Sequence, residues 1–163
     1  MAEGEFALTQ QHLEAGLQKG VEMGVVQGSD HDMYALLVDA AAQERDQAVL
    51  EKYTPLAQES ARIIDHKLDL AIADRARGVL HMLEGEFEQA EARLTRALEA
   101  FSTYPAPWQI GRTLFDLGDV ARAQGKQDEA REHFSRALDA FEQLRAAPYV
   151  ERARRALADL NDR

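Results

Sequence analysis

Five histidines are the residues of this sequence best suited to bind a metal ion or transfer protons: His12, His31, His66, His81 and His133. None of them belongs to an HExxH motif, and none lies four residues from a second histidine. None can share a site with a cysteine, because the chain has no cysteine. Zinc sites usually combine ligands at such spacings. We therefore expect ordinary surface or boundary histidines, with no metal site and no cofactor.

Glycines and carboxylates form no catalytic pattern either. Four glycines are spaced by an internal repeat and none is followed by the Lys-Ser or Lys-Thr of a phosphate-binding loop: Gly78, Gly85, Gly118 and Gly125. Acidic side chains alternate with arginines on the predicted helix faces, as Glu91 does with Arg93, which is typical of a solvated surface. Since no nucleophile and base share a motif, we expect that the chain is not an enzyme.

The composition describes one acidic globular unit. The chain has 163 residues, with 29 acidic and 19 basic side chains and a formal charge of -10. Such a charge repels nucleic-acid phosphates and anionic membranes, so we expect neither as a direct partner. No apolar run approaches the roughly 20 residues that span a bilayer, and the N-terminus lacks the pattern of a secretory signal. These features favour a cytoplasmic protein.

The elements that must position any site are predicted to be helices. Helix-favouring residues are abundant, only four prolines and ten glycines occur, and no segment alternates in the manner of a half-buried strand. The chain aligns with itself when position 78 is matched with position 118, and eight of the 24 positions from 78 to 101 are then identical to their counterparts. The run RALEAF at 96–101, for example, meets RALDAF at 136–141. This internal repeat predicts a stack of similar helix pairs.

Eight helices are predicted from the apolar periodicity and the turn residues. They cover residues 6–26, 31–44, 46–66, 68–84, 87–103, 107–124, 127–145 and 148–161. The copies of the repeat are 31–70, 71–110 and 111–150, with half copies at 5–28 and 148–161, and residues 1–163 form a single domain.

Two residues inside these helices predict local features. Pro55 predicts a kink in the third helix, or a restart with Thr54 as the N-cap. Gly118, in the middle of a helix, costs about 1 kcal/mol relative to Ala. We expect close approach of a second helix to offset that cost, with Ala137 as the facing residue.

The helix pair resembles the tetratricopeptide repeat. The resemblance is carried by Leu-Gly in the first helix, Gly at the turn, Ala early in the second helix, and an aromatic residue followed by Ala-Leu. In the copy 111–150 the matching residues are Leu117, Gly118, Gly125, Ala130, Phe134, Ala137 and Leu138. In the copy before it they are Gly78, Gly85, Phe87, Ala90, Leu94, Ala97 and Leu98.

The length of the repeat adds a second resemblance. The repeat period is the spacing between equivalent positions such as 78 and 118. It exceeds the usual length of a tetratricopeptide repeat, which is about 34 residues. Long repeats with segments like those at 108–114 and 137–142 resemble the C-terminal helical arms of large bacterial LuxR-type and ATPase signalling regulators.

The resemblance implies a fold and a binding surface. The fold is an all-α, right-handed superhelical stack of antiparallel helix pairs, an α-solenoid of about eight helices whose first helices line a concave face. The partner-binding residues on this face would be Ile72, Arg75, Val79, Met82, Arg112, Phe115, Asp119 and Arg122. The corresponding places in the earlier copy belong to Asp32, Ala35, Asp39 and Ala42.

Two interpretations of the concave arginines remain open. The planar fork of arginine suits carboxylates, so Arg75, Arg112 and Arg122 would capture an acidic peptide segment between apolar walls. Alternatively, these arginines pair across helix turns with aspartates of the same chain, namely Asp74, Asp116 or Asp119.

The function implied is that of a protein–protein interaction or scaffold module, which binds a peptide or a partner protein on its concave face. The alternative is an effector-sensing arm of a larger transcription or signalling regulator. The N-terminal helix has no first helix of its own to pair with, so it is expected either to cover the next pair incompletely or to form a weak homodimer. The polar last helix is expected to cap the other end.

Overall fold

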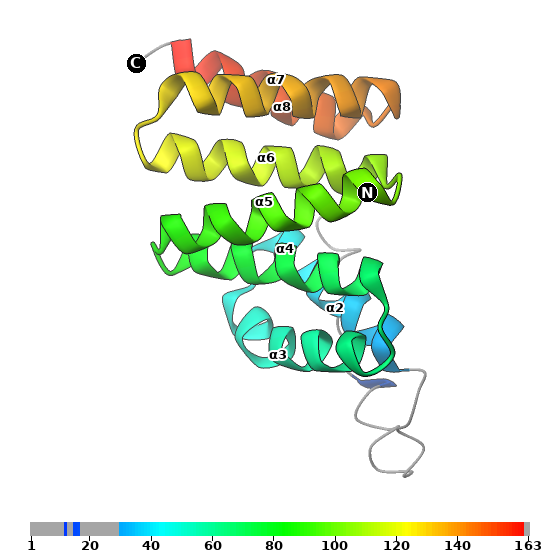
Figure 1. Ribbon diagram of the computed structural model, residues 1–163. Coiled ribbons are helices and arrows are strands. Elements are labelled where there is room, and N and C mark those ends of the chain that lie inside the picture. The colour runs from blue at the N-terminus through cyan, green and yellow to red at the C-terminus, as the bar shows by residue number, and fades with distance from the viewer. Residues whose placement is uncertain (1–11, 13–14, 17–29, 162–163) are drawn as a thin grey trace.

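The computed structural model describes residues 12, 15, 16 and 30–161, and this part of the chain is helical with no strand. Its seven helices are stacked in chain order, from α2 and α3 at one end to α8 at the other (Figure 1). They are α2 (Asp30–Glu44), α3 (Gln47–Ile63), α4 (Lys67–Leu83), α5 (Phe87–Thr103), α6 (Pro107–Ala123), α7 (Gln127–Gln143) and α8 (Ala147–Asn161). The predicted all-α repeat stack is confirmed. The predicted helix at 6–26 falls almost wholly outside the described residues.

The helices recur with the spacing that the repeat predicts. From α3 onward they begin at residues 47, 67, 87, 107, 127 and 147, so equivalent helices of successive copies are separated by one constant interval. At the turns within pairs the backbone has positive φ, at Arg45 (58°), Gly85 (79°) and Gly125 (75°). The backbone N–H of the next residue donates a hydrogen bond to a carbonyl oxygen of the preceding helix; Glu86 N, for example, donates to His81 O at 2.8 Å. Glycine is favoured at these turns because it has no Cβ to oppose the left-handed conformation.

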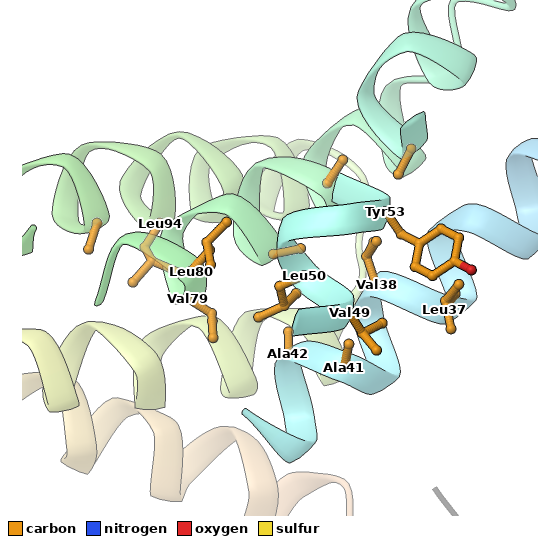
Figure 2. Close-up of a cluster of buried hydrophobic side chains, with 14 of the residues drawn as sticks. Leu37, Val38, Ala41, Ala42, Val49, Leu50, Tyr53, Val79, Leu80 and Leu94 are labelled. Atoms are coloured by element: carbon orange, nitrogen blue, oxygen red, sulfur yellow. The ribbon is translucent and has the colours of Figure 1, made fainter. Parts of the chain in front are cut away.

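Each pair buries an apolar stripe from both of its helices. α2 packs on α3, α4 on α5 and α6 on α7, and α8 covers α7. Side chains of α2 to α5 gather in one core cluster, in which Leu50, Val79 and Leu94 have no exposed surface (Figure 2). Phe134 and Phe141 of α7 are buried in a second cluster. Each such side chain contributes about 1.5 to 3 kcal/mol through burial.

Gly118 marks a close helix approach, as predicted, but the facing residue is different. A Cβ at Gly118 would lie 2.5 Å from Cε1 of the Phe134 ring, and a Cβ at Gly78 would lie 2.7 Å from Cγ of Leu94. The two partners occupy the same place in successive copies. The prediction of Ala137 is therefore wrong: it is Phe134, about one helical turn earlier on α7, that fills the space left by the glycine.

Pro55 does not divide the third helix. α3 is continuous from Gln47 to Ile63 with Pro55 inside it. Its N-cap is Asp46, whose carboxylate accepts a hydrogen bond from Val49 N at 3.1 Å. The predicted restart with Thr54 as N-cap is therefore wrong, because an aspartate one turn before the apolar stripe already caps the helix.

The last helix has the character of an end cap. Ala153, Ala156 and Leu160 of α8 face the core, whereas the charged residues of the helix are exposed: Glu151, Arg152, Arg154, Arg155 and Asp159. Within the described part of the chain, no helix is long and apolar enough to cross a membrane.

Candidate functional site

The face of the stack formed by α2, α4, α6 and α8, called here the first-helix face, carries the predicted site residues. Arg75 of α4 lies at its centre and is only 2% exposed. Its Nε and Nη2 donate to Asp116 Oδ2 of α6 at 2.9 and 2.8 Å. Its Nη1 donates to Asp39 Oδ1 of α2 at 3.1 Å. The guanidinium is thus shared between two carboxylates of the same chain.

Arg112 of α6 is held in a similar way and is 4% exposed. It donates to Asp39 Oδ2 at 2.7 Å, to the Asp39 carbonyl oxygen at 3.0 Å and to Gln43 Oε1 at 3.0 Å. Burial, followed by the nearby charge of Arg75, lowers the pKa of the Arg112 guanidinium. Each of the three guanidinium nitrogens of Arg112 thus donates to an acceptor within the chain.

Arg45, in the turn after α2, completes the arrangement. Its Nη2 lies 2.8 Å from Asp116 Oδ1 and 3.1 Å from Asp119 Oδ2. Burial acts to raise the pKa of Asp116, but the guanidinium groups around it outweigh this effect and hold its pKa below the usual value. Asp119 differs, because burial raises its pKa although Arg45 and Arg122 oppose the rise.

These six side chains, called here the Arg–Asp cluster, are Arg45, Arg75, Arg112, Asp39, Asp116 and Asp119. They join α2 and the turn after it to α6, with ion pairs between residues 71 to 74 positions apart in the sequence. The predicted open groove along α4 is therefore closed by the chain's own charges. Of the two interpretations, internal pairing describes all three arginines: Arg75 and Arg112 pair between helices, whereas Arg122 pairs with Asp119 across one turn of α6.

The apolar residues predicted on α4 differ in their exposure. Val79 has no exposed surface and belongs to the core. Ile72 and Met82 are half-buried and pack against the same core. The prediction that these residues line an open groove therefore fails for Val79, which is buried in the core.

An open pocket lies further along the first-helix face, between α6 and α8. It has a volume of about 560 Å³ and is lined by three predicted residues, Phe115, Asp119 and Arg122. Six residues of α8 form the rest of its wall: Pro148, Glu151, Arg152, Arg155, Ala156 and Asp159. We call it the α6–α8 pocket.

The charges in the α6–α8 pocket are unequally engaged. Arg122 donates to Asp119 Oδ1 at 2.7 Å, and Arg155 Nε lies 3.3 Å from Glu151 Oε1. Arg152 instead lies over the ring of Phe115, with 4.4 Å from its guanidinium carbon to the ring centroid. Within the described ranges no carboxylate pairs with Arg152. A cation held on an aromatic face keeps its donors available to an incoming acceptor.

The repeat register carries a signal for the α8 residues. In the next copy of the repeat, Arg152 occupies the position equivalent to Arg112, and Asp159 the position equivalent to Asp119. Arg155 likewise occupies the position equivalent to Phe115, so all three positions of the next copy line the pocket. Arg45 had a different signal, because an arginine stands where later copies have the turn glycine.

One further group of side chains has the composition of a metal site. His81 Nδ1, at the end of α4, lies 2.7 Å from Glu86 Oε2 and 3.5 Å from Glu84 Oε2. The three possible ligand atoms lie within 4.8 Å of one another. A hydrogen bond between the imidazole and Glu86 accounts for this geometry, and both glutamates are exposed.

Fold and site together define a helical-repeat protein. Residues 69–143, which run from α4 to the end of α7, match the family model of the tetratricopeptide repeat. This match supports the predicted resemblance to tetratricopeptide repeats for these two helix pairs. No curated protein matches the chain in sequence.

The stack as a whole is also similar to a solved structure. The crystal structure of BtubC (BKLC) from P. vanneervenii aligns with a TM-score of 0.61 and 18% sequence identity. The alignment covers 98% of this chain and 76% of that one. At this level of identity the likeness extends to the fold alone.

Proposed function

We propose that this protein is a recognition module that binds an acidic, partly apolar segment of a partner protein in the α6–α8 pocket. Tetratricopeptide repeats generally mediate protein–protein interaction or scaffolding, and they are typically non-catalytic. The pocket combines the ring of Phe115 with the guanidinium of Arg152. A ligand that carries an apolar side chain next to a carboxylate would engage both.

The observation that supports this proposal most directly is the state of Arg152. Arg75 and Arg112 already have carboxylate partners in the Arg–Asp cluster, so a ligand would have to break buried ion pairs to reach them. Arg152 requires no such exchange, because it rests on the ring of Phe115. An incoming carboxylate would therefore break no direct ion pair of this guanidinium among the described residues.

Charge on the rest of the molecule favours selectivity for such a ligand. The net charge of -10 discourages phosphate-rich polymers at long range. Arg152 attracts a carboxylate at short range, whereas Arg122 and Arg155 already pair with Asp119 and Glu151. A short acidic peptide satisfies both conditions, since only its few carboxylates enter the pocket.

The test is a binding titration with matched arginine variants. Fluorescence anisotropy would follow labelled peptides that place Glu or Asp beside Leu or Phe, against the wild type, Arg152→Ala and Arg154→Ala. Arg154 is the control, because it is exposed on the same helix but pairs with Glu142 of α7 at 2.7 Å. Both variants therefore lose one positive charge from α8, but only Arg152→Ala loses it from the pocket.

We expect Arg152→Ala to weaken binding by about 1 to 2 kcal/mol, between the values for a solvated and a desolvated charge pair. Arg154→Ala should bind as the wild type does. Equal losses in both variants would show that binding follows net charge rather than the pocket. No binding by the wild type to any peptide of the panel would refute the proposed function.

A further inference from the structure

Asp119 is shared between the α6–α8 pocket and the Arg–Asp cluster. Its Oδ1 accepts from Arg122, on the pocket side, at 2.7 Å. Its Oδ2 accepts from Arg45, on the cluster side, at 3.1 Å. A carboxylate divided in this way neutralises neither arginine completely. Whatever weakens one of the two contacts leaves Asp119 free to strengthen the other.

The position of Arg45 is unusual for its place in the repeat. Its φ of 58° is left-handed, and the corresponding residues of the next two copies are Gly85 and Gly125. This conformation is unfavourable for a residue that carries a Cβ. The side chain of Arg45 offsets this cost by reaching across to α6, where its Nη2 meets both Asp116 and Asp119. Its Nη1 is buried without a hydrogen-bond partner among the described residues.

We propose that Arg45 is a positioning residue for the α6–α8 pocket: by holding one oxygen of Asp119, it keeps Arg122 partly free for an acidic ligand. This inference rests on the proposed function, since it names the residue that tunes the same pocket. Arg45 is not itself among the residues that line the pocket. It acts through Asp119 and links the turn between α2 and α3 to a site formed by α6 and α8.

The direction of the effect follows from the geometry. Without Arg45, Asp119 has Arg122 as its closest remaining cation and pairs with it fully, so Arg122 is less available to a ligand carboxylate. Without the charge of Asp119, Arg122 is released and the pocket becomes more positive. The two changes therefore act in opposite directions, and loss of Arg45 has little effect once Asp119 is neutral. Binding at the pocket and the state of the turn are coupled reciprocally.

The experiment is a double-mutant cycle with Arg45→Gly and Asp119→Asn. Glycine is chosen because it suits the positive φ at this turn, as in the later copies. The matched control is Arg145→Gly, which removes an exposed arginine from a turn with φ of 53°. Arg145 belongs neither to the Arg–Asp cluster nor to the lining of the pocket. Arg45→Lys, which keeps the positive charge, is the conservative variant. Thermal unfolding of each variant establishes that it is folded.

Acidic-peptide binding is the first readout. We expect Arg45→Gly to weaken binding at least about fivefold, Asp119→Asn to tighten it, and Arg45→Gly to change it less than about twofold in the Asp119→Asn background. Arg45→Lys should restore part of the affinity, and Arg145→Gly should leave it unchanged. An equal loss on Arg45→Gly with and without the Asp119 charge would overturn the proposal.

A second readout needs no ligand and separates this inference from the proposed function. The Asp119 carboxyl is followed by carbon NMR as the pH is lowered. Since Arg45 opposes the rise of the Asp119 pKa, Arg45→Gly should raise that pKa further, whereas Arg145→Gly should not. A shift in the free protein with no peptide binding by the wild type would refute the proposed function but keep the coupling contact. No shift of the Asp119 pKa would overturn the contact itself.

Discussion

Substitution of Gly118 by alanine tests the closest helix approach in the stack. The added Cβ would lie 2.5, 2.6 and 2.9 Å from three carbons of the Phe134 ring. The ring is fully buried and packs on Phe115, with 5.0 Å between the ring centroids, so it cannot swing away without disturbing α6. Overpacking of this kind costs about 1 to 3 kcal/mol, and we place it in the upper part of that range because the clash is with a confined ring.

Alanine also favours the helix by about 1 kcal/mol relative to glycine. The net expectation is a loss of about 1 to 2 kcal/mol in the free energy of unfolding. For a chain of this size that corresponds to a fall in Tm of about 2 to 8 °C. Gly118→Ala combined with Phe134→Leu should lose less stability than the two single changes would together, because a smaller side chain leaves room for the Cβ. The measurement is thermal unfolding followed by circular dichroism. An unchanged or raised Tm for Gly118→Ala would refute the packing argument.

Three further perturbations have defined outcomes. Arg75→Leu should lower the free energy of unfolding by about 3 to 5 kcal/mol, because it leaves Asp39 and Asp116 without their shared cation in a buried site; chemical denaturation measures it. Asp46→Ala should cost about 1 kcal/mol through loss of the α3 cap, seen in the same assay. Burial lowers the pKa of His133 below 6.5, the ordinary value for histidine. Below that pH the imidazole of His133 therefore binds a proton more readily in the unfolded chain than in the folded one. The free energy of unfolding should therefore fall as the pH is lowered through 6.5, and it should fall less in His133→Asn. Melting curves of both proteins from about pH 7.5 to about pH 5.5 would measure this.

The fold was predictable because its determinants are local and repeated. Helix-favouring composition, apolar stripes and the glycines at 85 and 125 each recur in register with the repeat, and each acts within one pair. For the seven helices that the structure describes, the predicted boundaries consequently lie within three residues of the observed ones. The Gly118 contact was only half predictable: the need for a small residue is visible in the sequence, whereas the offset between antiparallel helices, which selects Phe134 over Ala137, is not.

The candidate site was less predictable because it depends on curvature. Spacing within the repeat assigns Arg75, Arg112 and Phe115 to first helices, but it does not say how closely successive first helices approach one another. Here α2 and α6 come near enough for Asp39 to bind Arg75 and Arg112 together. That distance is set by all the packing between them, so no short motif reports it. Arg152 was predictable in principle by continuing the repeat register into α8.

The Arg–Asp cluster also changes how the stack holds together. In an ideal repeat stack each pair contacts only its neighbours, and a terminal pair can detach at the cost of one interface. Here detachment of α2 would also remove Asp39 from Arg75 and Arg112, and Arg45 from Asp116 and Asp119. Because these charges are largely buried, separating them is costly in a way that a lost apolar contact is not. The first pair is thereby bound to the third, and the helix that carries one wall of the α6–α8 pocket is fixed from both sides, by α7 and by the cluster. A pocket on a helix held in this way is preorganised for its ligand, so less of the binding free energy is spent on ordering it.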